Sequence, residues 1–268
     1  MKRAILAATL ALVALTDKGA AHEFWIDPQD YTIAEGDVLL GDLRVGQEFS
    51  GASMSYLPRN FVTFDVLSGD RSFVVEGRLG DIPALSMPDL PDGLAVVVHE
   101  TTRNRLAWTD WERFFNFAVH KDLGDVVALH EARGLPQENV IENYYRFAKS
   151  LVAVGDGAGA DRRVGLRTEL VALANPYTDD VSGGLPVQLW YEDELQADYQ
   201  IELFTRDAAG AVTITYHRTD AAGVALLPVA PGMTYMVDSV FLAPLEPTAD
   251  SDAIWATYWA NLTFTVPQ

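Results

Sequence analysis

The sequence contains no cysteine among its 268 residues. Without thiols there is no disulfide framework, and there is no thiolate ligand for structural zinc or for copper(I). A chain of this length can bury a core large enough to fold without such crosslinks. Any bound transition metal would therefore be held by nitrogen and oxygen donors.

Basic residues are scarce as well. Lys and Arg number 19 against 38 Asp and Glu, which gives a formal net charge of −19 at pH 7. This charge repels the phosphates of nucleic acids and anionic lipid headgroups, so we expect neither as a partner. It favours cations, although most of the carboxylates are expected only to solvate the surface.

Long apolar runs are missing except at the start of the chain. Lys2 and Arg3 precede an apolar run over residues 4–15, and Ala20-Ala21 follows it, which is the layout of a secretory signal peptide. The run is shorter than the roughly 20 residues that a spanning helix needs. We expect residues 1–21 to be removed on export to the periplasm, so that His22 becomes the first residue and no later segment enters a membrane.

The pattern of apolar residues predicts a mainly β fold. Up to about Arg105, strand-length runs alternate with turn signals such as LSGD and PDLPDG, as in an all-β sandwich. Similar runs return over residues 166–268. The predicted fold class is two β-sandwich (Ig-like) domains, 22–154 and 166–268, with a helical segment between them and a flexible linker over residues 155–165.

The helical segment is expected at about residues 108–152. Trp111, Phe114, Phe115 and Ala118 fall at helical spacing and predict the first helix. A second helix is expected over residues 124–133. A third is expected over residues 138–152, because Ile141, Tyr145, Ala148 and Val152 would share one side of it.

Five histidines are the candidate nitrogen donors: His22, His99, His120, His130 and His217. As a first residue, His22 would offer its α-amino and imidazole nitrogens together, a donor set that suits Cu(II) or Ni(II). We therefore predict a metal site of His22 with His99 and His120, and with His217 as a more distant choice.

Each of these histidines also has a structural interpretation. His99 can be a hydrogen-bonded core residue, His120 and His130 can lie at solvated helix ends, and His217 can face solvent beside Thr213 and Thr215. No local metal motif such as H-E-x-x-H joins the five, so the fold would have to build the site. Catalytic motifs such as G-x-S-x-G and the P-loop are absent too, and we do not expect an enzyme.

Several segments together resemble a known family. The motif HEFWIDP behind the leader, YYRFAKSLVAVG, TDAAGV and the terminal YWANLTFTV resemble a bacterial periplasmic family of domains of unknown function labelled as nickel-uptake, substrate-specific components. The resemblance runs from His22 to Val266. It implies a periplasmic protein that handles Ni²⁺ or Co²⁺ in association with transport, with His22 at the start of the family's N-terminal motif.

The resemblance departs from the label at two places. The label speaks of a transmembrane region, whereas this sequence has no candidate after its leader, so the chain could deliver metal to a membrane transporter component but not conduct it. Arg146 and Lys149 match the motif around Tyr145, but we interpret these two cations as structural.

The predicted function is periplasmic binding of a divalent transition metal, Ni²⁺ or Co²⁺ with Cu²⁺ also possible, in support of metal uptake. Two other classes stay open. One is a copper-dependent oxidase with a histidine brace at His22. The other is a glycan- or protein-binding module without metal, which would use exposed Trp108, Trp111, Trp255 and Trp259.

Overall fold

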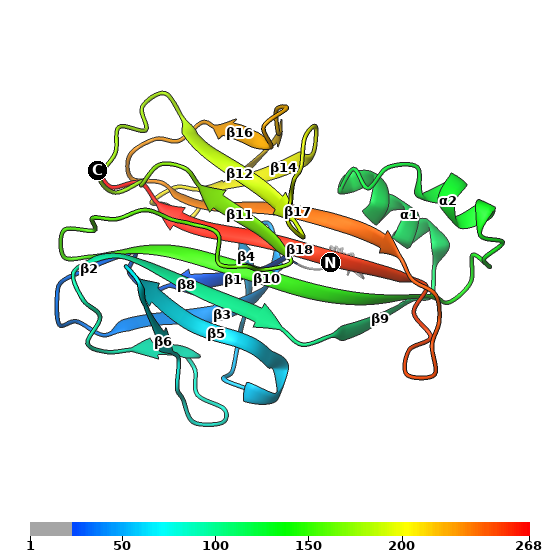
Figure 1. Cartoon of the computed structure of the whole chain (residues 1–268), viewed down its shortest axis with the longest axis horizontal. Coiled ribbons are helices and arrows are strands. Elements are labelled where there is room, and N and C mark those ends of the chain that lie inside the picture. The colour runs from blue at the N-terminus through cyan, green and yellow to red at the C-terminus, as the bar shows by residue number, and fades with distance from the viewer. Residues whose placement is uncertain (1–22) are drawn as a thin grey trace, which may run out of the picture.

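The computed structural model describes residues 23–268, which form three stacked β-sheets and two short helices (Figure 1). The strands of the central sheet are β2 (Thr32–Ile33), β5 (Phe61–Ser68), β6 (Arg71–Val74), β8 (Gly93–Thr101), β9 (Asn104–Trp108), β10 (Val140–Val154), β14 (Gln200–Arg206), β15 (Val212–Arg218), β17 (Thr234–Pro244) and β18 (Trp255–Thr265). They follow the order β15-β14-β17-β18-β10-β8-β5-β6, and β2 and β9 pair with β10.

Two smaller sheets flank the central one. The N-terminal sheet contains β1 (Glu23–Pro28), β3 (Leu39–Gln47), β4 (Ser50–Met54) and β7 (Leu85–Met87). The C-terminal sheet contains β11 (Thr168–Ala172), β12 (Leu185–Tyr191), β13 (Glu194–Leu195) and β16 (Val224–Leu227). The remaining elements are a 3-10 turn, η1 (Pro58–Asn60), and the helices α1 (Trp111–His120) and α2 (Val126–Ala132).

Alternation along the central strands explains the layers. On β8, Leu94, Val96 and Val98 pack into the core beneath the C-terminal sheet, whereas Ala95 and Val97 pack beneath the N-terminal sheet. Successive side chains of a strand point to opposite faces, so the two small sheets cover opposite faces of the central sheet. The prediction of a mainly β chain built from sandwiches with a helical segment is confirmed.

The helices lie at one end of the molecule (Figure 1). They pack on Trp255 and Trp259, which alternate along β18 with residues of the core beneath the C-terminal sheet, so they cover the same face of the central sheet as the N-terminal sheet. Each begins at an aspartate: the side chain of Asp110 accepts from the amide of Glu112, and that of Asp125 accepts from the amide of Ala128. The first two predicted helices are thus confirmed. The predicted stripe needs one correction, because Phe117 is buried and Phe115 is 38% exposed.

The third predicted helix, over residues 138–152, is wrong, because this segment is the long strand β10. It pairs in parallel with β18 and antiparallel with β8 and β9, so it lies in the middle of the sheet. Phe147 and Leu151 face one core while Ala148 and Val152 face the other. A strand buried on both faces shows no alternation of apolar and polar residues, and its apolar positions can then match a helical period by coincidence.

The predicted domain division, with a linker at 155–165, stays a prediction. Strands from both sides of it are hydrogen-bonded into one central sheet. The segment itself is anchored by Lys149, which is 1% exposed and whose Nζ lies 2.7 Å from Asp161 Oδ1 and 3.1 Å from Glu169 Oε1.

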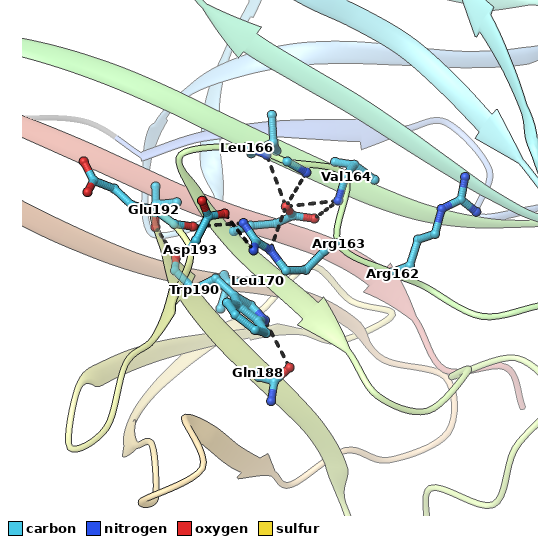
Figure 2. Close-up of polar contacts among 12 residues, drawn as sticks. Arg162, Arg163, Val164, Leu166, Leu170, Gln188, Trp190, Glu192 and Asp193 are labelled. Atoms are coloured by element: carbon cyan, nitrogen blue, oxygen red, sulfur yellow. Dashed lines mark hydrogen bonds and ion pairs between the residues drawn. The ribbon is translucent and has the colours of Figure 1, made fainter.

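The loop after the segment closes over the same group. Glu169 accepts hydrogen bonds from the backbone amides of Val164, Gly165 and Leu166. Figure 2 shows Val164 and Leu166 at this group, with Arg163 lying over the ring of Trp190 near Asp193. No helix within residues 23–268 is long and apolar enough to cross a membrane.

Candidate functional site

His22, the predicted anchor of the metal site, lies outside the described residues. The other predicted donors, His99, His120 and His217, lie in three separate surroundings. The sequence therefore identified the residues as candidates, but the described fold does not gather these three imidazoles around one point.

His99 is buried on β8 inside a box of aromatic rings. The centroids of Phe24, Phe61 and Phe64 lie 5.1, 4.7 and 5.0 Å from that of its imidazole. Burial lowers the pKa of His99 to about 3, so the ring is neutral at physiological pH. Neither ring nitrogen has a hydrogen-bond partner within the described chain.

His217 and His130 have partners of their own. On the outer strand β15, His217 is partly exposed and its Nε2 lies 2.8 Å from Thr215 Oγ1, as expected for residues that share a face. The predicted surface position of His130 is wrong, because the residue is fully buried. Its Nε2 pairs with the carbonyl of Pro136 and its Nδ1 accepts from Trp255 Nε1, which makes it a structural residue.

His120 lies at the end of α1, with about half of its side chain exposed, beside the central sheet. Its Nε2 is 3.8 Å from Oε1 of Glu202 on β14, and its ring meets Tyr216 of β15 edge-on. Burial, and next the charge of Lys121, lower the pKa of His120. The imidazole is therefore neutral near pH 7, which is the form that binds metal.

The next residue, Lys121, joins three elements at one buried point. Its Nζ lies 3.2 Å from Glu23 Oε1 at the start of β1, 3.0 Å from Glu202 Oε2 on β14, and 3.2 Å from Asp238 Oδ2 on β17. All four side chains are less than 9% exposed. We call these four residues the Lys121 cluster. In this cluster Glu23, the residue that follows His22, lies close to Glu202, the partner of His120.

The cluster has more carboxylates than cations at its centre. Burial raises the pKa of Glu23, and burial together with Asp238 raises the pKa of Glu202 to about 7. Burial alone would lower the pKa of Lys121, but Asp238, Glu202 and Glu23 together raise it well above its usual value. The ammonium is therefore charged at neutral pH, and three carboxylates share its single positive charge.

Three oxygens at the cluster have no hydrogen-bond partner among residues 23–268. They are Glu23 Oε2, Glu202 Oε1 and Asn261 Oδ1, and the amide of Asn261 donates to Asp238 at 3.3 Å. Buried polar atoms are nearly always paired in folded proteins, so unpaired oxygens gathered at one cluster indicate a missing donor or cation.

The described residues do not form a metal site by themselves. Within residues 23–268, no group of three or more His, Asp or Glu side chains could hold a metal ion. Sequence reasoning missed Glu23, Glu202 and Asp238, because residues so far apart along the chain give no local signal.

The glycan-platform alternative depends on exposed tryptophans. Trp108, Trp255 and Trp259 are each less than 5% exposed and belong to the core under α1 and α2, and Trp111 packs against that core. Three of the four side chains therefore offer no surface to a sugar.

Over residues 19–241 the chain matches the family described as "Domain of unknown function (DUF4198)", and it belongs to that family. No curated protein matches the chain.

Two solved structures are similar to the chain. One is a tetra-tandem repeat in the extending region of a large adhesion protein, at 11% identity and a TM-score of 0.20, covering 92% of this chain and 50% of that one. The other is the D0–D1 domain of intimin, at 14% identity and a TM-score of 0.21, covering 91% of this chain and 97% of that one.

Proposed function

We propose that this member of the family is an exported, periplasmic protein that binds a divalent transition metal, Ni²⁺ or Co²⁺, at the start of its mature chain. The observation that carries the proposal is the meeting of Glu23, the residue after His22, with Glu202, the partner of His120, at the Lys121 cluster. His22 would supply its α-amino and imidazole nitrogens there, with His120 and Glu202 as further donors.

The spacing of His120 and Glu202 suits a shared ion. Bonds from a divalent first-row metal to imidazole nitrogen or carboxylate oxygen are about 2.1 Å long, as in zinc proteins, so one ion can join atoms up to about 4.2 Å apart. His120 Nε2 and Glu202 Oε1 are 3.8 Å apart, and this oxygen has no other partner within the described chain. Glu202 can keep its contact with Lys121 through Oε2.

The charge of the site also favours a cation. Three carboxylates surround one ammonium, and two of them have raised pKa values. A divalent ion would supply the positive charge that the cluster lacks. His99 and His217 lie elsewhere in the fold and are not part of the proposed site.

We further propose a carrier rather than an enzyme, one that delivers its ion to a membrane transporter component. The oxidase alternative needs a second imidazole and an open coordination position at the same ion. Because both candidate functions use His22, metal binding has to be tested first, and turnover of a reductant with oxygen afterwards.

The test begins with the intact mass and N-terminal sequence of the exported protein. Calorimetric titration with Ni²⁺ and Co²⁺ then compares the mature chain with a chain that carries one extra N-terminal alanine. We expect the alanine to weaken binding at least tenfold, because it blocks the amino nitrogen of His22. H120A should also weaken binding at least tenfold, whereas H217A, the matched control, should not.

A mature chain that begins elsewhere, or one that binds equally well with the extra alanine, would contradict the amino-terminal site. Equal losses in H120A and H217A would contradict the role of His120.

A further inference from the structure

We propose that the cavity beside His99 binds a small carboxylate or oxyanion. The cavity has a volume of about 40 Å³ and lies between the N-terminal sheet and the central sheet. Its polar lining consists of Ser55, Asn60, His99, Thr101, Asn104 and Arg146. Each of these side chains carries at least one N–H or O–H donor, and none of them is a carboxylate.

The absence of carboxylates is informative in a chain that has twice as many acidic as basic residues. Two larger cavities make the contrast. A cavity of about 340 Å³ places Asp70 and Asp92 beside Arg71 and Arg162. In the other, of about 500 Å³, Arg105 is paired with Asp252 at 2.7 Å. The lining of the His99 cavity differs from these two in that it contains no carboxylate.

His99 is the buried polar group that needs a partner. It is 1% exposed, and neither of its ring nitrogens has a hydrogen-bond partner within residues 23–268. A neutral imidazole keeps one N–H donor, and the aromatic rings around it offer no acceptor in the plane of that bond. An anionic oxygen in the cavity would accept from this N–H.

Arg146 supplies a positive charge: burial lowers its pKa, and the charges of Asp238, Glu142 and Glu23 oppose that shift. Its guanidinium lies over the rings of Phe24 and Tyr144, 5.6 and 4.8 Å from their centroids. Its backbone amide donates to Thr101 Oγ1 at 3.1 Å, and that hydroxyl can still donate its own proton. An arginine fixed on aromatic faces is a suitable partner for a planar anion.

The size of the cavity limits the ligand. One water molecule occupies about 30 Å³ in the liquid, so the space suits an anion the size of formate or nitrate, or the carboxylate end of a larger molecule. The lining of this cavity contains neither His120 nor any residue of the Lys121 cluster, although the charges of Asp238 and Glu23 act on Arg146.

The test is an NMR titration of the mature chain with sodium formate and, separately, with sodium nitrate. Sodium chloride holds the ionic strength constant, and the amides of Thr101 and Asn104 are the reporters. We expect saturable shifts at millimolar anion. Saturation by both probes would indicate an oxyanion site, and saturation by formate alone would indicate a carboxylate site.

The variants H99F and R146Q should each weaken anion binding at least tenfold, while H217F, on the exposed β15, should leave it unchanged. If H99F does not fold, R146K answers the same question, because it should retain part of the affinity that R146Q loses. Shifts that do not saturate up to 50 mM (about fifty times a dissociation constant of 1 mM), or equal affinities in R146Q and R146K, would overturn the proposal. Binding of Ni²⁺ by H99F should be unchanged, so failure here leaves the metal proposal standing.

Discussion

Two buried lysines sit among carboxylates in this molecule, and they differ in whether the group around them is complete. Lys149 contacts Asp161 and Glu169 and also donates to the carbonyls of Arg162 and Leu170. The oxygens of Glu169 accept from three backbone amides, and Asp161 accepts from the amides of Arg162 and Ala172. Every charged atom in this group has a partner.

The group around Lys121 is not fully paired in this way. Lys121 faces three carboxylates, and Glu23 Oε2 and Glu202 Oε1 have no partner in the described part of the chain. Backbone amides hold the charge of a carboxylate, whereas burial without such donors opposes it. Burial and ion pairing therefore do not distinguish the two groups, whereas the unpaired oxygens do.

The largest effect is expected from removing the complete group. K149M leaves Asp161 and Glu169 buried without their cation, which should cost about 3–5 kcal/mol of unfolding free energy. Urea unfolding at pH 7 measures this loss, and R59M, at an exposed arginine, is the control. A loss no larger than that of the control would show that Lys149 does not hold the 155–165 segment in place.

Removing the other lysine should have an effect that depends on pH. K121M should cost about 3 kcal/mol at pH 8 and about half of that at pH 5, because Glu23 and Glu202 can take up protons once the lysine is gone. Their folded pKa values are raised above the unfolded values, so the penalty grows as pH rises from about 4.5 to 7. Urea unfolding of metal-free protein at both pH values checks this. If K121M lost the same unfolding free energy at both pH values, the contrast between the Lys121 and Lys149 groups would be contradicted.

Two matched glutamates sharpen the comparison. Because the pKa of Glu202 is raised to about 7, its ionisation costs stability progressively as pH rises from about 4.5 to 7. Relative to wild type, E202Q should therefore gain about 1–2 kcal/mol of stability as pH rises from 5 to 8. E169Q should instead lose stability, because the backbone amides and Lys149 lose the charged oxygens that they contact. Denaturation curves of both variants from pH 5 to 8 measure these changes in unfolding free energy. The same change with pH in E202Q and E169Q would contradict the difference between the two groups.

The smallest effect is expected at the rim of the Lys149 group. Arg163 stacks on Trp190 at 4.4 Å and pairs with the exposed Asp193 at 3.2 Å. Exposed pairs of this kind contribute little, so R163A should cost less than about 1 kcal/mol. Thermal unfolding measures it. A loss comparable to that of K149M would mean that the rim, rather than the buried lysine, closes the loop.

Much of the fold could be predicted from the sequence. Short runs between turn signals predicted the strands, and the helical spacing of Trp111, Phe114 and Ala118 predicted α1. Residues 138–152 were predicted wrongly because β10 is buried on both faces. Its apolar residues therefore follow neither the helical nor the strand period clearly. The three-layer stacking could not be predicted, since it depends on β10 pairing with β18 more than 100 residues later.

The candidate site could be predicted only in part. Histidine is rare enough that His120 was selected from composition alone. Its partner Glu202 is one of 38 acidic residues, and nothing in the local sequence separates it from the others. The tertiary fold brings the start of β1, the end of α1 and the middle of β14 together, and no local pattern encodes that meeting.

The most direct test of the central claim is pulsed EPR of the mature chain loaded with one equivalent of Cu²⁺, which occupies nitrogen-oxygen sites tightly whatever the physiological metal is. The measurement counts the imidazoles bound to the ion. The account predicts at least two imidazoles in the wild type, one fewer in H120A and an unchanged number in H217A. The same number in H120A as in the wild type would contradict a metal site between the start of the mature chain and the Lys121 cluster.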